Sequence, residues 1–450
     1  MDTTLSGCND HFGWRLALKA FRVILLVGVV MAWVVGSSAC SLRPLIYDVS
    51  VAPTTISPNA DRNDDVTRIE YKLARNATFS IYLQDEAGEK HYFRYQRDRS
   101  RTLGQPYRVD FGGVIPREVD GFRQDRVLPD GTYTLVLEAT DADNRTVTHT
   151  VPFTVVDADT TPPVIEGFTM DRHVFTPNRD GVDDRVKLSY YLTKEANTLV
   201  YLLDADGKKY PIEKDYSNSA TKEGEVGPHY YDYEGGVDKG AEPPPDGVYT
   251  VVVYAEDKVG NKVTVTDTLE IKDGGVPRAT IVGLEWDVSD TVIPVGGTLY
   301  FTATVENYGN TPIRTTGPQP GTQYTTDWNA ATLGYYERAG VFRLGVGFEN
   351  CPLGDYPWRW SVGRYDELTA VQRGDETLYY LMPGQRVVVN GSIQILDPLP
   401  DTSVLFWTGL IHEQVEVVNP RVDPKRITVD EEPSGPWVTR ATPTPIVDPQ

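Results

Sequence analysis

The stretch Phe-Thr-Pro-Asn-Arg-Asp-Gly-Val-Asp-Asp, residues 175–184, decides the organisation of the chain, because a related stretch lies upstream. That copy, Ile-Ser-Pro-Asn-Ala-Asp-Arg-Asn-Asp-Asp, occupies residues 56–65. Both are rich in turn-forming residues, since Pro fixes its own backbone angle and Asn and Asp bond to nearby backbone. The chain therefore contains a repeat, and each copy opens with this loop.

Alternating segments follow each loop. Residues 67–73 and 78–83 in the first copy, and 186–192 and 198–203 in the second, alternate between apolar and polar side chains. A period of two is typical of β-strands that bury one face. Each copy therefore predicts the first half of a β-sandwich.

Each copy closes with the motif Asp-Gly-x-Tyr, at residues 130–133 and 246–249, which leads into a further strand. A turn containing Asp and Gly also follows the second strand of each copy, at residues 85–88 and 204–207. This order of Pro-Asn loop, Asp-Gly turn and Asp-Gly-x-Tyr strand resembles the immunoglobulin-like domain of the flagellar hook-capping (FlgD-type) family of bacterial exported proteins. The resemblance covers residues 48–157 and 164–273, and a long polar insert before each Asp-Gly-x-Tyr departs from the family's pattern. It implies a β-sandwich that spaces, adheres or docks without chemistry of its own.

The composition changes from Arg278 onward, because six of the eight tryptophans fall between Trp286 and Trp437. Residues 295–312 and 382–393 each read as a turn followed by an alternating strand. These segments resemble the cell-adhesion-related domain of bacteria (CARDB) and its NBR-type relatives. The resemblance implies a third immunoglobulin-like sandwich.

The sequence thus predicts an all-β chain of three tandem immunoglobulin-like β-sandwich domains after an N-terminal lipoprotein signal or membrane anchor. The expected segments are a signal peptide with lipobox at 1–40, FlgD-type domains at 41–157 and 164–273, linkers at 158–163 and 274–280, a Trp-rich CARDB-like domain at 281–428, and a disordered tail at 429–450. The Pro-rich first linker and the Gly-rich second linker suggest beads on a short string.

The N-terminus has the pattern of an export signal. Arg15, Lys19 and Arg22 precede an apolar run at residues 23–35, which is shorter than the roughly 20 residues needed to span a bilayer. The following Gly-Ser-Ser-Ala-Cys resembles a bacterial lipobox, which implies that Cys40 is lipidated. An uncleaved signal anchor and simple secretion are the alternatives, and all three place the body outside the cytoplasm.

The charge balance limits the partners. The formal net charge is -21 and the sequence pI is about 4.7. A chain without a basic face cannot neutralise the phosphates of a nucleic acid, so nucleic acid is excluded as a partner. The expected partners are a membrane, through the N-terminal lipid or anchor, and a protein or glycan that the sequence does not identify.

The two acidic loops place oxygen-bearing side chains at close intervals, as calcium sites do. The candidate ligands are Asn59, Asp61, Asn63, Asp65, Asn178, Asp180, Asp183 and Asp184. The alternative is that these residues only shape the turns, since Asn and Asp side chains bond to their own backbone. Apart from calcium, no cofactor is expected.

Tyr356, Trp358 and Trp360 lie two residues apart, so in a strand they share one face. Exposed together, they would form a platform on which a sugar ring stacks. In a β-sandwich, the same spacing also fills the core. The sequence leaves both alternatives open.

Known catalytic motifs are missing from the sequence. It contains no Gly-x-Ser-x-Gly elbow, phosphate loop or dinucleotide fingerprint, and His412-Glu413 lacks a second histidine four residues on. We therefore expect no enzyme. The predicted function is that of a cell-envelope lipoprotein acting as a surface-displayed structural, adhesion or docking module, and the alternative is a carbohydrate-binding protein that uses the aromatic third domain.

Overall fold

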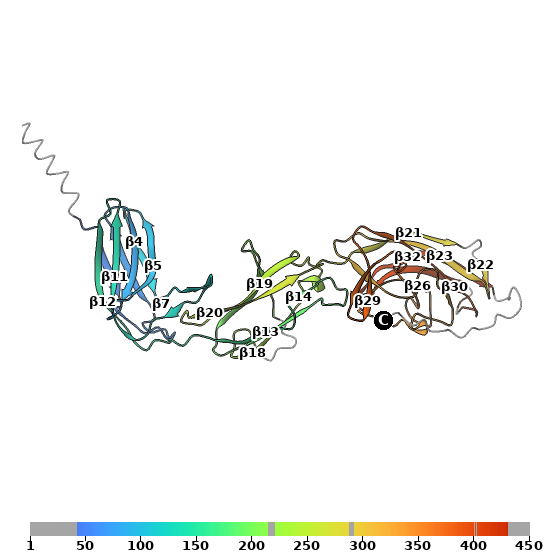
Figure 1. Cartoon of the computed structure of the whole chain (residues 1–450), viewed down its shortest axis with the longest axis horizontal. Coiled ribbons are helices and arrows are strands. Elements are labelled where there is room, and N and C mark those ends of the chain that lie inside the picture. Colours follow the sequence, from blue (N-terminus) through green and yellow to red (C-terminus); the bar gives the residue numbers. More distant parts are fainter. Residues whose placement is uncertain (1–42, 215–220, 288–291, 400, 402, 431–450) are drawn as a thin grey trace, which may run out of the picture. The chain divides into compact units, whose positions relative to one another are not determined.

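The computed structural model describes residues 43–214, 221–287, 292–399, 401 and 403–430, and it consists of β-strands with two short 3-10 turns and no α-helix in those residues (Figure 1). Most strands pair antiparallel, and they build three two-sheet sandwiches. The predicted all-β class of tandem β-sandwiches is therefore confirmed. The lipidation prediction at Cys40, the signal segment and residues 431–450 of the tail lie outside the described residues.

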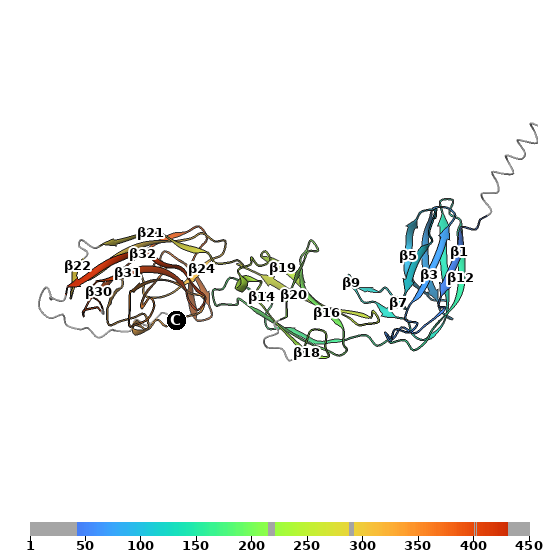
Figure 2. The same ribbon diagram turned by 180° about the vertical axis from the view of Figure 1, so that it is seen from behind.

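The first sandwich contains twelve strands. They are β1 (Ile46–Ala52), β2 (Thr55–Ile56), β3 (Thr67–Leu73), β4 (Ala77–Gln84), β5 (Lys90–Arg99), β6 (Tyr107–Phe111), β7 (Val114–Ile115), β8 (Glu118–Val119), β9 (Phe122–Arg123), β10 (Arg126–Val127), β11 (Gly131–Asp141) and β12 (Thr146–Val155). One sheet has the order β1-β3-β6, and the other has the order β2-β12-β11-β4-β5. Figure 1 labels β4, β11 and β12, and the reverse view in Figure 2 labels β1 and β3 of the other sheet.

The second sandwich repeats this topology. Its strands are β13 (Ile165–Met170), β14 (Val174–Phe175), β15 (Val186–Leu192), β16 (Asn197–Leu203), β17 (Lys209–Pro211), β18 (Gly227–Tyr233), β19 (Gly247–Glu256) and β20 (Lys262–Ile271), with the 3-10 turn η2 (Val237–Lys239) before β19. The sheets have the orders β13-β15-β18 and β14-β20-β19-β16-β17, which match those of the first sandwich strand for strand. The sequence repeat is therefore a repeat of one fold.

The third sandwich has two larger sheets. Its elements are β21 (Ala279–Asp287), β22 (Val292–Pro294), β23 (Thr298–Asn307), β24 (Ile313–Thr315), β25 (Gln323–Thr325), η3 (Ala331–Leu333), β26 (Phe342–Phe348), β27 (Trp358–Ser361), β28 (Thr369–Arg373), β29 (Glu376–Leu381), β30 (Arg386–Gln394), β31 (Ser403–His412) and β32 (Glu416–Asp430). One sheet has the order β21-β23-β30-β25, and the other has the order β22-β32-β31-β26-β24-β29-β28 with β27 paired to β26. Because β32 continues to Asp430, residues 429 and 430 belong to this sandwich.

In each repeat, side chains of the Asp-Gly-x-Tyr motif form hydrogen bonds to the backbone at the closing strand. The Tyr133 hydroxyl donates to the Pro129 carbonyl at 2.8 Å, and Tyr249 makes the same bond to Pro245. Asp130 accepts from the backbone N–H groups of residues 157 and 158, where the chain leaves the sandwich. A tyrosine that bonds to backbone just upstream is a known fastening of immunoglobulin-like sandwiches.

The described residues divide into two compact units. The first unit comprises the first sandwich to residue 164 together with 194–197 and 255–264, and the second comprises 165–193, 198–254 and 265–430. The second and third sandwiches therefore share a unit, apart from two loops that pack with the first sandwich. The predicted domain boundaries and linkers stay predictions. Within the described residues, no helix has the length and hydropathy of a membrane span.

Candidate functional site

The first acidic loop is a network of side-chain-to-backbone bonds. The Asp65 carboxylate accepts from the backbone N–H groups of Asn59, Ala60 and Arg62 at 2.8–3.2 Å. The Asn59 and Asp61 side chains each accept from the N–H two residues on. These bonds explain why the loop needs Asn and Asp at these positions.

The second loop repeats most of this network. Asp184 accepts from the N–H groups of Asn178, Asp180 and Gly181, and Asn178 and Asp180 each accept from the N–H two residues on. The backbone matches too, because Arg62 in the first loop and Gly181 in the second both have positive φ, of 73° and 81°. The two loops therefore share one conformation.

The second loop differs in being covered by the third sandwich. Asp180 is 4% exposed, and its Oδ2 accepts a 2.8 Å hydrogen bond from the Tyr380 hydroxyl of β29. The Nε2–H of His412, at the end of β31, donates to the Arg179 carbonyl at 2.8 Å. Asp183 forms ion pairs with Arg172 of its own sandwich and with Arg373 of the third.

Two glycines permit the close approach of these backbones. A Cβ on Gly181 would lie 2.3 Å from the Ala339 carbonyl oxygen, and a Cβ on Gly340 would lie 2.1 Å from the Asp180 carbonyl carbon. Both distances are far below van der Waals contact. The matching position of the first loop is Arg62, which is exposed and therefore carries a side chain freely. We call the contact of residues 178–184 with the third sandwich the loop joint.

A buried ion network supports the loop joint from the third sandwich. Glu413 is 1% exposed, and its Oε1 accepts from Arg343 at 3.1 Å and from Arg359 at 3.0 Å. Its Oε2 accepts from the Arg338 backbone N–H, and its carbonyl accepts from the Gly340 N–H. This network fixes residues 338–341 against which the second loop packs.

Burial changes the titration of the groups at the loop joint. Burial, together with the nearby Asp180 carboxylate, raises the pKa of Asp184 to about 6. Burial also raises the pKa of Asp180, although the Tyr380 hydroxyl opposes this change. Burial lowers the pKa of His412 to about 4, so its imidazole is neutral at pH 7.

The predicted calcium ligands remain a prediction, and the structure shows how their oxygens are used. Six of the eight candidates accept backbone N–H groups, which is the turn-forming alternative, and these are Asn59, Asp61, Asp65, Asn178, Asp180 and Asp184. Asp183 instead pairs with two arginines. Among the described residues, only Asp85, Glu89 and His91 bring three metal-ligating atoms of His, Cys, Asp or Glu within 4.8 Å of one another. Asp85 there accepts from the Glu89 N–H and pairs with His91, and these bonds account for the cluster.

The predicted aromatic platform is wrong, because the three rings are buried. Trp358 and Trp360 are 0% exposed in the main core of the third sandwich, and their indole N–H groups donate to the carbonyls of Thr325 and Thr322. Tyr356 is 6% exposed and packs in a separate cluster with Trp407 and Ile411. It precedes β27 with a φ of 51°, so it does not share the face of the two tryptophans. Core packing, the other alternative, explains the spacing.

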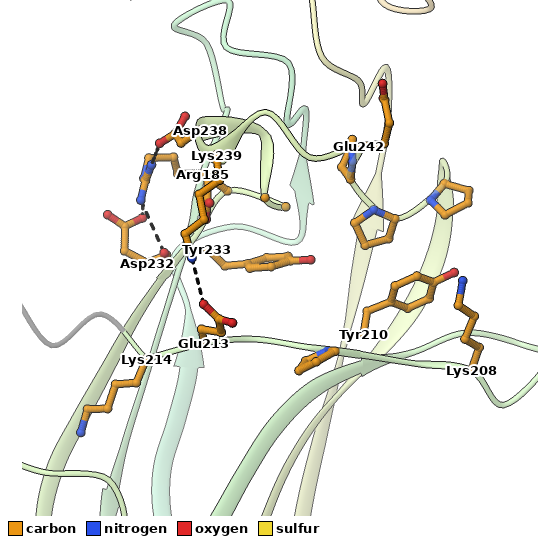
Figure 3. Close-up of a pocket in the computed structure, with 17 residues that line it drawn as sticks. Arg185, Lys208, Tyr210, Glu213, Lys214, Asp232, Tyr233, Asp238, Lys239 and Glu242 are labelled. Atoms are coloured by element: carbon orange, nitrogen blue, oxygen red, sulfur yellow. Dashed lines mark hydrogen bonds and ion pairs between the residues drawn. The ribbon is translucent and has the colours of Figure 1, made fainter.

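A groove of about 710 Å³ lies within the second sandwich (Figure 3). Its lining includes Tyr210 of β17, Tyr233 of β18 and Pro243–Pro245. This size falls within the roughly 300–1,000 Å³ typical of small-ligand sites. The sequence did not indicate it, although the long polar insert before Asp-Gly-x-Tyr supplies most of its lining.

Ion pairs occupy much of the groove's rim. Arg185 lies between Asp232 and Asp238, and Lys239 pairs with Glu213 at 2.9 Å, as Figure 3 shows. The buried ammonium of Lys214 donates to the Thr221 carbonyl and to His229. Most cationic side chains on the lining are therefore already paired within the protein.

The first unit contains a second polar joint. The Asn261 amide oxygen accepts from the Val127 N–H, and its amide nitrogen donates to the Asp159 carbonyl. Lys262 pairs at 2.9 Å with Asp125, a carboxylate that is 1% exposed. The insert of the first sandwich thus contacts the tip of the β19–β20 hairpin, which accounts for the placement of residues 255–264 in the first unit.

No protein-family profile and no curated protein matches the chain. A solved structure of a Ca2+-stabilised adhesin that helps an Antarctic bacterium bind ice is 15% identical over 86% of this chain and 74% of its own, with a TM-score of 0.21. A structure concerning host cell surface retention of a 1.5-MDa bacterial ice-binding adhesin is 12% identical over 87% and 99%, with a TM-score of 0.20. The SGBP-B protein of a Bacteroides ovatus mixed-linkage glucan utilization locus, in complex with a heptasaccharide, is 12% identical over 86% and 71%, with a TM-score of 0.15. At these scores, the likeness carries no argument about function.

Proposed function

We propose that the chain is a non-enzymatic protein of the bacterial cell envelope that displays a docking or adhesion unit on the outer side of a membrane. The lipidated Cys40 attaches the chain to the membrane, the first sandwich serves as a spacer, and the second and third sandwiches together form the displayed unit. Partners are bound outside the cytoplasm, and nucleic acid is not among them.

The loop joint is the observation that carries this proposal. The hydrogen bond from Tyr380 to Asp180 is buried, and the glycine contact brings two backbones together without side chains between them. Such a joint holds two sandwiches as one body, whereas an ordinary linker leaves them free to move. A fixed pair of sandwiches presents a larger constant surface to a partner than either sandwich alone.

The proposal is tested by locating the third sandwich in intact cells. An epitope tag is inserted after Leu353, in an exposed turn where a Cβ on Gly354 would meet no atom within 4 Å. We expect antibody to label intact cells that carry the tagged chain, and Cys40→Ser to release the tag into the medium together with loss of fatty-acid labelling. Labelling only after lysis would contradict surface display, and fatty-acid labelling that persists in Cys40→Ser would contradict the anchor.

A further inference from the structure

The groove of the second sandwich contains a tyrosine whose hydroxyl is open to a ligand. Tyr233 is 8% exposed as a whole, and its hydroxyl makes no hydrogen bond with the described residues. Its ring projects into the groove in Figure 3, and it lines the groove together with Tyr210. A hydroxyl that opens on a groove and has no partner in the protein is a group to which a bound ligand can form a hydrogen bond.

Burial keeps this hydroxyl neutral. Burial and the neighbouring Glu234 carboxylate raise the pKa of Tyr233 above its usual value. The group is therefore both a donor and an acceptor at any physiological pH. A partner that offers both functions, such as an alcohol, matches it better than a carboxylate or an ammonium.

The charges of the groove argue against an ionic ligand. Five carboxylates and four cationic side chains line it, so neither sign prevails. Arg185, Lys214 and Lys239 are held by partners inside the protein, and the Lys208 ammonium lies 4.4 Å above the Tyr210 ring. Fixed ion pairs still offer carboxylate oxygens and N–H groups to hydroxyls, which bond to charged groups without having to neutralise them.

The aromatic and proline surfaces supply the apolar part of recognition. Tyr210 and Tyr233 present rings to the groove (Figure 3), and Pro243–Pro245 add apolar lining. A pyranose ring has hydroxyls on its rim and C–H groups on its faces, so it matches a groove with rings on its walls and charged groups on its rim. A polyproline peptide would contact the rings but would leave most of the rim without hydrogen bonds.

We infer that the groove between β17, β18 and Pro243–Pro245 of the second sandwich binds a neutral oligosaccharide, with the Tyr233 hydroxyl bonded to a sugar hydroxyl and Tyr210 packed on a ring face. This inference deepens the proposed function by naming a ligand class. It places the sugar site in the second sandwich, and the buried tryptophans of the third take no part. Because binding is measured on purified protein, its failure is distinguishable from a failure of surface display.

The test is calorimetric titration of the full chain, purified in a detergent without a sugar headgroup. The probes are cellohexaose and maltohexaose as neutral oligosaccharides, hexagalacturonate as an acidic one, and decaproline as the peptide alternative. We expect at least one neutral hexasaccharide to bind and the other two probes not to bind. Absence of binding by both neutral sugars, or binding of hexagalacturonate or decaproline in their place, overturns the inference.

Variants locate the site. Tyr233→Phe removes only the hydroxyl and is expected to weaken binding about three- to tenfold, as the loss of one hydrogen bond does. Tyr210→Ala is expected to weaken it more than about tenfold. Tyr230→Phe is the matched control, because Tyr230 is 57% exposed on the opposite face of β18, and its affinity should equal that of the wild type. Sugar binding unchanged in both Tyr233→Phe and Tyr210→Ala would overturn the assignment to this groove.

Discussion

The two acidic loops have one conformation and two environments. Residues 59–65 and 178–184 share most of their hydrogen bonds and their positive φ angles, yet Asp61 is exposed whereas Asp180 is buried under the third sandwich. The Asn and Asp side chains therefore form the same turn in both copies, whereas only the second copy contacts the third sandwich. The same motif therefore forms a simple turn in the first sandwich and, in the second sandwich, a contact with the third.

Substitution at the glycine contact of the loop joint should lower the free energy of unfolding most. We expect Gly340→Ala to lower the free energy of unfolding of the third sandwich by about 3 kcal/mol, because an added Cβ collides with backbone and the φ of 79° disfavours a side chain. Urea unfolding followed by tryptophan fluorescence measures this, since every tryptophan in the described residues lies in the third sandwich.

A matched control separates the collision from the backbone strain. Gly384, in the turn between β29 and β30 of the third sandwich, also has a positive φ, of 76°, but a Cβ there meets nothing within 4 Å. Gly384→Ala should therefore cost only about 1 kcal/mol by the same measurement. Equal losses in Gly340→Ala and Gly384→Ala would show that the collision at Gly340 does not lower stability.

Asp184 and His412 of the loop joint should give the next largest effect. Their contributions to the free energy of unfolding change with pH in opposite directions. In His412→Gln, the remaining Asp184 has a folded pKa of about 6, above its unfolded value, so its contribution favours the folded state as the pH falls from 7 to 4.5. In Asp184→Asn, the remaining His412 has a folded pKa of about 4, below its unfolded value, so its contribution disfavours the folded state over the same range.

We therefore expect the two contributions to change by about 2 kcal/mol each in opposite directions, so that the unfolding free energies of these variants diverge by about 4 kcal/mol between pH 7 and pH 4.5. Urea titrations at both pH values measure the divergence, and carboxylates away from the loop joint contribute equally to the two variants. Parallel pH profiles would mean that Asp184 and His412 are not buried as the loop joint requires.

The hydrogen bond from Tyr380 to Asp180 should contribute less to the free energy of unfolding. Tyr380→Phe leaves the Asp180 carboxylate without its buried donor, and we expect a loss of about 1.5 kcal/mol. Tyr379→Phe is the control, because the Tyr379 ring stacks on Tyr365 away from Asp180. Hydrogen exchange of residues 178–182 should accelerate in the first variant and stay unchanged in the second.

Calcium should have the smallest effect on the stability of the chain. The oxygens of Asp65 and Asp184 accept three backbone N–H groups each, so we expect no rise in the melting temperature of the chain when calcium replaces chelator. A ligand that binds only the folded state would raise it by mass action. A clear rise, abolished by Asp65→Asn together with Asp184→Asn, would make the loops metal sites.

The strands were predictable from the sequence because their signal is local. The alternation at residues 67–73 and 186–192 coincides with β3 and β15, and the Asp-Gly-x-Tyr motif marked the closing strands. The loop joint was not predictable, because it rests on pairs such as Asp180 and Tyr380 that lie 200 residues apart. The groove was missed because the insert that lines it has no periodic pattern, and the spacing of Trp358 and Trp360 did not reveal which face they occupy.

Hydrogen exchange of the two loops in the full chain tests the central claim most directly. The backbone N–H groups of residues 59, 61, 62 and 63 and of the matching residues 178, 180, 181 and 182 are all bonded to loop side chains, so at these positions the loops differ mainly in what covers them. We predict that residues 178–182 exchange far more slowly than 59–63, at rates close to those of β29 and β31. Equal, fast exchange in both loops would show that the third sandwich does not cover the second loop, which would contradict the loop joint.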